Sequence, residues 1–274
     1  FMQKFLEILK NETEWDDMKY RNWVMQCKNW RDNYPVVQKK HYKDKKPINV
    51  YAFIDILSRH LPEKSITVVA NGSASVVGSA AYYIKKGQRF IMNCAISSMG
   101  YDLPAAVGAC VAAEKKPVIC IAGDGSIMMN LQELQTIVTN GLPVKIFIIN
   151  NQGYQQIRIT QSNLFDKNYV GIGPDSRDLG FPDFEKIAEA FGIPYRKCEE
   201  LTMLTEMVDW MLDEKQYSML EVCCTTEQIF EPKSATKRLA DGSLYSPPLE
   251  DLAPFLPREE LKKNMFIPMW KEGK

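Results

Sequence analysis

Residues 118–126 read VICIAGDGS, and this stretch sets the architecture of the chain. Its first five residues are all apolar, which is typical of a strand buried on both faces of a sheet. A segment with helical spacing follows at 131–139 and ends at Asn140-Gly141, and a second apolar run occupies 144–149. Apolar strands that alternate with helices indicate an α/β protein. We expect an open, mainly parallel sheet with helices on both faces.

The same alternation extends to both sides of this stretch. We expect further helices at 50–60, 103–113, 184–191 and 201–212, and further strands at 66–70, 89–93, 195–198 and 218–224. Small and polar residues gather just after three of the expected strands, at 71–75, 123–126 and 150–153. Because ligands of parallel α/β sheets bind at the carboxyl ends of the strands, these three clusters form the candidate site.

Composition argues against several other classes of protein. The chain has 274 residues with 34 basic and 34 acidic side chains, so no excess charge would attract nucleic acid or an anionic membrane surface. Its longest apolar runs are too short to cross a bilayer. The seven cysteines include no CxxC pair, and we expect reduced, mostly buried thiols. His41 and His60 lie far from every motif, which argues against a histidine-centred triad or metal site.

The cluster at 123–126 suits a phosphate group and a hard cation. Its glycines allow a tight turn and the close approach of a ligand, and the Ser126 hydroxyl with nearby amides could face a phosphate. Asn151 follows the next strand along the chain, so Asp124 and Asn151 are expected to point at one ion. Mg²⁺ prefers oxygen ligands, and the Gly153 carbonyl is within reach of the same position. Each motif alone is also an ordinary turn, whereas their pairing at two strand ends is more specific.

With these motifs in view, the sequence resembles the thiamine diphosphate enzymes, with a closer likeness to the large catalytic subunit of acetolactate synthase. The likeness covers about residues 47–225 and rests on three stretches: MGYDLPAA at 99–106, AGDGS at 122–126 with NLQEL at 130–134, and LPVK at 142–145 leading to Asn150-Asn151. The resemblance implies a thiamine diphosphate-binding fold. It also implies carbon–carbon bond cleavage or formation on 2-oxo acids such as pyruvate, with thiamine diphosphate and Mg²⁺ as cofactors.

The resemblance further implies a role for each matching position. Asp124 and Asn151 would bind Mg²⁺ through their side chains, and Gly153 through its carbonyl. Met99 and Ser97 would be the catalytic positions: Met99 as the hydrophobic support of the bent cofactor, Ser97 as a backbone acceptor for its aminopyrimidine. Without the resemblance, Met99 is interpreted as core filler. The other expected cofactor contacts are Gly72, Ser73, Ala74, Gly123, Gly125, Ser126 and Tyr154.

The family pattern also predicts how the chain is divided. We expect residues 1–46 to be the end of a preceding central domain and a linker, 47–225 the diphosphate-side binding domain, and 226–274 a Pro-rich arm. The pyrimidine domain, with its catalytic glutamate, is expected in another part of the same chain or in a neighbouring one. We therefore expect this chain alone to bind cofactor weakly without turnover, and the full-length protein to be a cytoplasmic homodimer or homotetramer.

The type of reaction stays open at this point. The family's tryptophan after the Asn-Asn segment is absent, because residues 158–162 read RITQS, and this favours a different or larger acceptor. A 2-oxo acid decarboxylase that forms no new bond is one alternative, and a non-catalytic cofactor-binding module is another. A nicotinamide-dependent dehydrogenase is disfavoured, because no GxGxxG motif follows the first expected strand.

Overall fold

The structure, a computed structural model, describes residues 2–11, 17–239 and 241–269. It divides into two compact units, Phe1–Val36 and Val37–Lys274.

The first unit consists of helical segments. Helix α1 spans Met2–Asn11, and helix α2 spans Asp17–Asn33. Trp23 and Trp30 lie two turns apart on α2, and their rings meet edge to face with centroids 5.7 Å apart. These two tryptophans therefore lie on one face of the helix, whereas Trp15 lies outside the described residues.

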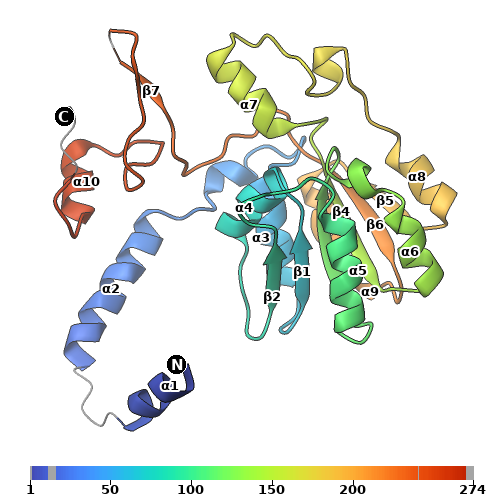
Figure 1. Ribbon diagram of the computed structural model, residues 1–274, viewed down its shortest axis with the longest axis horizontal. Coiled ribbons are helices and arrows are strands. Elements are labelled where there is room, and N and C mark those ends of the chain that lie inside the picture. Colours follow the sequence, from blue (N-terminus) through green and yellow to red (C-terminus); the bar gives the residue numbers. More distant parts are fainter. Residues whose placement is uncertain (1, 12–16, 240, 270–274) are drawn as a thin grey trace. The chain divides into compact units, whose positions relative to one another are not determined.

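The second unit is built on a six-stranded parallel sheet with the order β2-β1-β3-β4-β6-β5 (Figure 1). The strands are β1 (Ile66–Val69), β2 (Arg89–Met92), β3 (Val118–Gly123), β4 (Val144–Asn150), β5 (Tyr195–Cys198) and β6 (Ser218–Cys223). The α-helices of this part are α3 (Val50–His60), α4 (Ser73–Ala81), α5 (Asp102–Ala112), α6 (Glu133–Asn140), α7 (Gln155–Leu164), α8 (Phe184–Phe191) and α9 (Leu204–Asp213). Short 3₁₀ turns are η1 (Lys39–Tyr42), η2 (Ile127–Asn130), η3 (Pro174–Ser176) and η4 (Leu201–Met203). The expected α/β architecture is thus confirmed.

Helices cover both faces of the sheet, which explains why its central strands β3 and β4 are apolar along almost their whole length, with Lys145 as the charged exception. On one face α3 packs with α4 and α9, and on the other α5 and α6 pack with each other and α6 with α8. Cys120 of β3 faces the α5 side of the sheet and packs with Leu103 and Leu134. Phe147 of β4 faces the other side, where its ring centroid lies 6.0 Å from that of Phe53. Burial on both faces removes the alternation of polar and apolar residues that a half-exposed strand shows.

The connections of the sheet leave a crevice at its carboxyl edge. The chain runs from β1 to β2 on one side of β1 and then returns to β3 on the other side. At such a switch point the two connections diverge, and ligands bind in the space between them. In the adjacent pair, Gly123 at the end of β3 lies opposite Ile149 of β4. The polar residues that follow β3 and β4 are therefore brought to the same edge.

The segment before α3 is more ordered than a solvated linker. His41 is buried, and its ring stacks on Tyr51 with centroids 4.4 Å apart. The Tyr42 hydroxyl donates a hydrogen bond to the Asp55 carboxylate at 2.6 Å. The polar sequence around His41 does not reveal this burial, because the aromatic surface that covers the ring comes from α3. The domain boundary at residue 46 stays a prediction.

The Pro-rich segment after residue 225 contains short regular elements. Strands β7 (Lys237–Arg238) and β8 (Leu244–Tyr245) pair antiparallel, and helix α10 spans Arg258–Asn264. Arg258 makes two hydrogen bonds to the Asp251 carboxylate, at 2.7 and 2.9 Å.

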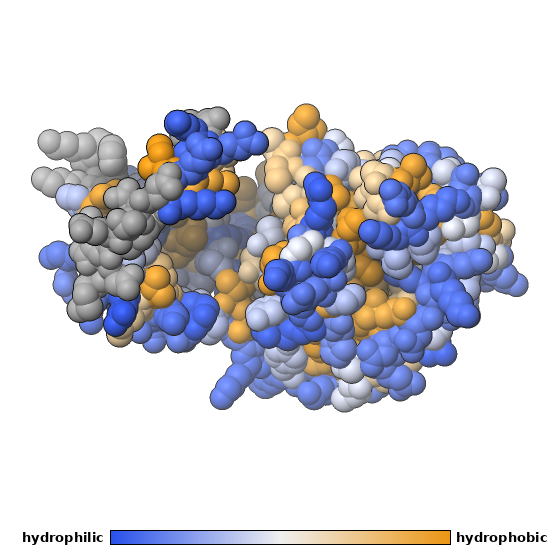
Figure 2. Space-filling model, turned by 90° about the horizontal axis from the view of Figure 1, so that it is seen from below, coloured by the Kyte–Doolittle hydropathy of each residue, from blue (hydrophilic) through white to orange (hydrophobic). Residues whose placement is uncertain are grey.

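The surface is mixed in character. On the face in Figure 2, hydrophilic residues predominate and apolar residues appear between them, as on most folded proteins. Among the described helices, none has the combination of length and apolar character that a membrane span requires.

Candidate functional site

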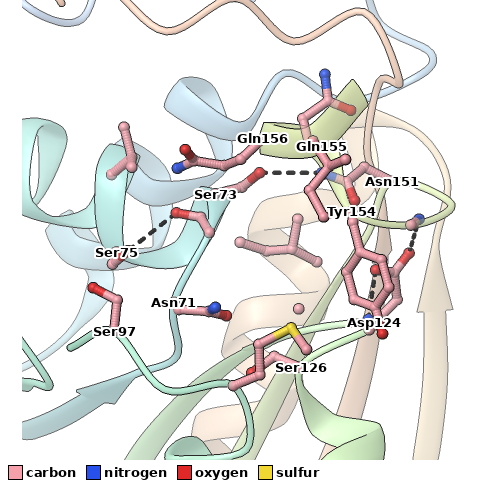
Figure 3. A pocket seen from close by; sticks show the side chains of 18 residues that line it. Asn71, Ser73, Ser75, Ser97, Asp124, Ser126, Asn151, Tyr154, Gln155 and Gln156 are labelled. Carbon is pink, nitrogen blue, oxygen red and sulfur yellow. Dashed lines mark hydrogen bonds between the residues drawn. The ribbon is translucent and has the colours of Figure 1, made fainter. Parts of the chain in front are cut away.

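A cavity of about 320 Å³ opens at the carboxyl edge of the sheet, beside the ends of β1, β3 and β4 (Figure 3). Its lining comes from the turn into α4, the loop before α5, the turn after β3 and the start of α7. The predicted positions that line it are Gly72, Ser73, Ser97, Met99, Gly123, Asp124, Gly125, Ser126, Asn151, Gly153 and Tyr154. Ala74 does not line it, because this residue is buried within α4. The structure thus gathers these residues, while their roles toward a cofactor stay predictions.

Asp124 joins the two strand ends. Its backbone amide donates to the Ile149 carbonyl at 3.1 Å, so it stands where β3 ends beside β4. The side chain is 2% exposed, and its two oxygens accept hydrogen bonds from the amides of Gly125 (2.7 Å) and Gly153 (2.9 Å). Burial raises the pKa of this carboxyl to about 7, although the surrounding backbone amides lower it in part. The result is a buried carboxylate that holds the turn after β4 against the turn after β3.

Asn151 is oriented by the first turn of α4. Its side-chain amide nitrogen donates to the Ser73 hydroxyl at 3.1 Å, and both side chains are buried. With the nitrogen engaged in this way, the amide oxygen is the atom left to face a ligand. The Asn151 side chain therefore connects the end of β4 to the start of α4, and it lines the cavity between these two segments.

Glycine is required at position 153. Its φ of 128° lies in the region that favours glycine, and a Cβ there would lie 1.8 Å from the carbonyl oxygen of Ile172. The neighbouring Tyr154 amide donates to that same carbonyl at 2.8 Å. This close passage of two backbone segments holds the Gly153 amide at the Asp124 carboxylate.

Gly125 provides space for an aromatic ring. A Cβ at Gly125 would lie 2.2 Å from the Tyr154 ring, so the ring packs directly on this glycine. On another side the ring meets Phe181 edge to face, with centroids 5.8 Å apart. Tyr154 therefore forms a fixed aromatic wall of the cavity, and burial raises the pKa of its hydroxyl.

Ser126 makes contacts that differ from the sequence-based expectation for its hydroxyl. The hydroxyl donates to the buried Asp102 carboxylate at 2.8 Å and accepts from the Gly100 amide at 3.0 Å. Asp102 is fully buried, and its other oxygen accepts from the Leu103 amide at 2.9 Å. The hydroxyl proton thus points at Asp102 rather than at a phosphate. Sequence reasoning missed this contact, because Asp102 is 24 residues away and the MGYDLPAA stretch that contains it gave no role for its carboxylate.

The loop that precedes α5 carries Ser97 and Met99. Met99 lines the cavity and is 40% exposed, so the interpretation as core filler is wrong. Ser97 has a positive φ of 50°, as has Ala95 with 70°. Backbone strain of this kind persists only where surrounding contacts hold it, and it is common at ligand sites. The Ser97 amide donates to the Asn93 carbonyl at 3.1 Å, and farther along the loop the Asn130 side chain donates to the Gly100 carbonyl at 2.8 Å.

The first turn of α7 was not predicted to contribute. Gln155, Gln156 and Ile157 line the cavity beside Tyr154. The unusually polar sequence of 152–156 was the available signal, but α7 lacks the apolar periodicity that would place it as a helix. Asn71 and Ser75 also line the cavity, and both belong to the small-residue cluster that follows β1.

The donor set fits a hard cation together with a phosphate ligand. Asp124 and Asn151 offer oxygen atoms, which suit Mg²⁺, and the N-terminus of α4 at Ser73 offers backbone amides to an anion. Within the described part of the chain, no three His, Cys, Asp or Glu side chains gather as metal ligands. A cation between Asp124 and Asn151 would therefore complete its shell with backbone, water and phosphate oxygens.

Fold and cavity together define an α/β protein with a polar ligand site at the carboxyl edge of a parallel sheet. Residues 70–222, more than half of the chain, match the family described as "Thiamine pyrophosphate enzyme, C-terminal TPP binding domain". The chain therefore belongs to the thiamine pyrophosphate enzymes.

Similar proteins include large subunits of acetolactate synthase. The chain is 32% identical over 203 residues to the acetolactate synthase large subunit of Parasynechococcus marenigrum (strain WH8102), which covers 73% of this chain and 31% of the relative. It is 33% identical over 188 residues to that of Porphyra purpurea, covering 69% and 30%. It is 30% identical over 227 residues to acetolactate synthase 2, chloroplastic, of Brassica napus, covering 81% and 35%. The chain thus spans about a third of the length of these relatives.

Proposed function

We propose that this chain is the diphosphate-binding part of a thiamine diphosphate- and Mg²⁺-dependent enzyme that cleaves and forms carbon–carbon bonds on 2-oxo acids. The observation that carries the proposal is the position of Asp124 and Asn151, which follow neighbouring parallel strands and line one cavity. The similarity to proteins named acetolactate synthase supports this reaction class.

Each part of the cavity has a distinct task in this proposal. Asp124 and Asn151 hold Mg²⁺ through side-chain oxygens, and Gly153 does so through its carbonyl. The turn at Gly72 and Ser73 offers backbone amides to the diphosphate, whereas Ala74 lies outside the cavity lining. The turn 123–126 offers the same from the opposite side. When bound, thiamine diphosphate supplies the electron sink for breaking a bond beside a ketone.

The remaining residues position the reacting groups and exclude water. Met99 presents its half-exposed side chain as a support, and Ser97 presents its carbonyl as an acceptor. Tyr154, packed on Gly125, walls off one side of the cavity. Such fixed groups lower a barrier by orientation and by substituting an ordered environment for water.

The rest of the catalytic apparatus belongs, in this proposal, to a pyrimidine domain in the same chain or a neighbouring one. This chain alone spans about a third of its relatives, so on its own it is expected to bind cofactor weakly without turnover. A homodimer or homotetramer of the full-length protein stays a prediction. So does the cytoplasmic location, since the name of the Brassica napus relative includes the word chloroplastic.

Calorimetric titration of the chain with thiamine diphosphate tests the proposal. We expect binding that requires Mg²⁺ and that is lost in Asp124→Ala. Asp209→Ala, which changes an exposed carboxylate of α9, serves as the matched control and should bind like the wild type. Binding that is the same with and without Mg²⁺, or unchanged by Asp124→Ala, would count against the proposed function.

A further inference from the structure

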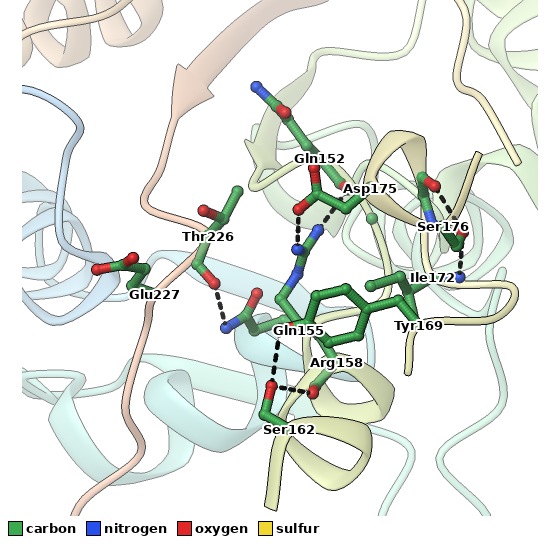
Figure 4. A network of polar contacts seen from close by, with 12 residues as sticks. Gln152, Gln155, Arg158, Ser162, Tyr169, Ile172, Asp175, Ser176, Thr226 and Glu227 are labelled. Atoms are coloured by element: carbon green, nitrogen blue, oxygen red, sulfur yellow. Dashed lines mark hydrogen bonds and ion pairs between the residues drawn. The ribbon is translucent and has the colours of Figure 1, made fainter. Parts of the chain in front are cut away.

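A second cavity, of about 520 Å³, lies beside α7 and shares Gln155 with the first (Figure 4). We call it the Arg158 cavity. It is lined by Arg158 and Ser162 of α7, by Lys167 and Asp175 of the segment that follows, and by Thr226 and Lys233 beyond β6. None of the motifs described above lies in this cavity. Because it adjoins the candidate cofactor site, a molecule bound in it would lie close to that site.

Arg158 is the chemically unusual member of this lining. Its side chain is only 7% exposed, and a buried guanidinium is unfavourable unless its donors are paired. It forms an ion pair with Asp175 and donates to the Gln152 carbonyl at 3.3 Å, while its Cζ lies 5.6 Å from the Tyr169 ring centre. Its Nε has no hydrogen-bond partner in the described part of the chain. The guanidinium therefore retains capacity for an anion.

Gln155, one helical turn away, is also incompletely paired. Its amide nitrogen donates to the carbonyls of Thr226 (2.9 Å) and Gln228 (3.2 Å). Its Oε1 is buried and has no partner among the described residues. An unpaired donor and an unpaired acceptor thus lie three residues apart on α7, beside the cavity, and buried polar groups of this kind usually have a partner.

Asp175 occupies the position that an external anion would take. It is 50% exposed although the guanidinium it faces is buried, and it belongs to the short turn η3 rather than to a packed helix. A half-exposed carboxylate can leave its partner at little cost in solvation. Figure 4 shows Asp175 and Gln152 at the guanidinium group, with Tyr169 beside it. The ion pair places a carboxylate directly at the guanidinium.

The other lining groups indicate the class of ligand. Three cationic side chains (Arg158, Lys167 and Lys233) and two anionic ones (Asp175 and Glu227) line the cavity, which leaves one net positive charge. Hydroxyl and amide groups make up most of the remaining polar lining. A three-carbon acid would fill only a small part of this volume. The cavity therefore suits an anion that carries several hydroxyl groups.

We propose that the Arg158 cavity binds the anionic group of a polyhydroxylated acceptor, and that Asp175 holds the guanidinium in its absence. The shared chemistry is an anion on a sugar-like chain, either a carboxylate or a phosphate. The role as an acceptor subsite depends on the function proposed above, whereas anion binding itself does not.

Calorimetric titration of the chain at low salt with gluconate, glucose 6-phosphate and glucose tests the proposal. At least one anion should bind at least about tenfold more tightly than glucose, because charge-assisted hydrogen bonds discriminate by this amount or more. Tighter gluconate binding identifies a carboxylate ligand, and tighter glucose 6-phosphate binding identifies a phosphate. Anions that bind no more tightly than glucose overturn the proposal.

Variants separate a ligand contact from a purely structural role. Arg158→Met should weaken anion binding about 10- to 100-fold, and Arg158→Lys by less, since it keeps the charge but loses the fork. Arg196→Met, on the exposed part of β5, should leave binding unchanged. Unchanged binding in a folded Arg158→Met overturns the proposal.

Asp175→Asn provides the second test and keeps the proposal decidable if Arg158→Met does not fold. Removal of the competing carboxylate should tighten anion binding several-fold, whereas weaker or equal binding overturns the placeholder role. Thiamine diphosphate and Mg²⁺ are titrated in parallel. Normal anion binding without cofactor binding would count against the proposed function alone, and the reverse result against the Arg158 cavity alone.

Discussion

Replacement of Ser126 by alanine tests whether its hydroxyl stabilises the fold by joining the turn after β3 to the residues around the start of α5. The hydroxyl bridges the Asp102 carboxylate (2.8 Å) and the Gly100 amide (3.0 Å), and all three residues are buried. Gly100 belongs to the loop that carries Met99 into the cavity. Ser126→Ala therefore removes one of the hydrogen bonds that tie this loop to the segment after β3, while the bond from Asn130 to the Gly100 carbonyl remains.

The expected size of the effect follows from the groups left without a partner. Loss of the hydroxyl leaves one oxygen of Asp102 and the N–H of Gly100 buried and unpaired. Each such group costs roughly 1–3 kcal/mol, so we expect a loss of about 2–6 kcal/mol in the free energy of unfolding. Burial already raises the pKa of Asp102, and the Ser126 hydrogen bond opposes that shift. The variant should therefore raise this pKa further.

Urea unfolding followed by circular dichroism measures the change, with Ser79→Ala as the control. The Ser79 hydroxyl is exposed and, among the described residues, donates to the Val76 carbonyl of its own helix, so its loss should lower the free energy of unfolding by less than about 0.5 kcal/mol. If Ser126→Ala unfolds like the wild type but no longer binds thiamine diphosphate, the hydroxyl contacts the phosphate instead and the structural role is wrong.

Two further variants test the backbone of the site and a buried charge. Gly153→Ala should destabilise the chain by several kcal/mol, on the order of other strained substitutions, because its Cβ would meet the Ile172 carbonyl. Gly108→Ala is the control: this residue lies in open space on α5, and its replacement should stabilise the chain by about 0.5–1 kcal/mol. The urea midpoints of both variants measure these changes. Lys145 is fully buried in β4, and burial lowers its pKa to about 8. Below pH 8 the folded protein therefore carries the full free-energy cost of burying this charge. That cost disappears as the pH rises from 8 to 10.5, the pKa of the lysine in the unfolded chain. The stability of the wild type minus that of Lys145→Met should therefore rise by at most about 3 kcal/mol from pH 8 to pH 10.5, and a flat or falling difference would refute a depressed pKa.

The central strands could be located from the sequence because their burial is complete. Residues 118–122 are continuously apolar and residues 144–149 are apolar except for Lys145, and the strands found are longer by a single residue each. Helices α3 and α8 match their expected limits, because each has an apolar face and a clear end signal such as Gly192.

Helices α4 and α7 escaped sequence-based prediction for opposite reasons. The α4 sequence SASVVGSAA is small and apolar almost throughout, so it has little periodicity. The α7 sequence QQIRITQSNL is polar almost throughout. Both helices are held by the sheet and by neighbouring segments rather than by their own pattern, and tertiary context of this kind overrides local preference.

Local motifs predicted the part of the site that lies at the ends of β3 and β4, whereas contacts between residues distant in sequence could not be predicted. Asp124 and Asn151 each follow an apolar strand, so parallel strand geometry alone brings their turns together. The contact from Ser126 to Asp102 and the Arg158 cavity join residues that are far apart in sequence, such as Arg158 and Thr226. Only the three-dimensional structure brings such pairs together.

The sharpest test of the shared ion is a double-mutant cycle on Mg²⁺-dependent binding of thiamine diphosphate. Asp124→Ala, Asn151→Ala and the double variant are titrated by calorimetry, after unfolding measurements show that each is folded. If both side chains hold one ion, the double variant should lose little more binding free energy than Asp124→Ala alone. Losses that simply add would mean that the two residues act independently, and the metal bridge between the ends of β3 and β4 would have to be abandoned.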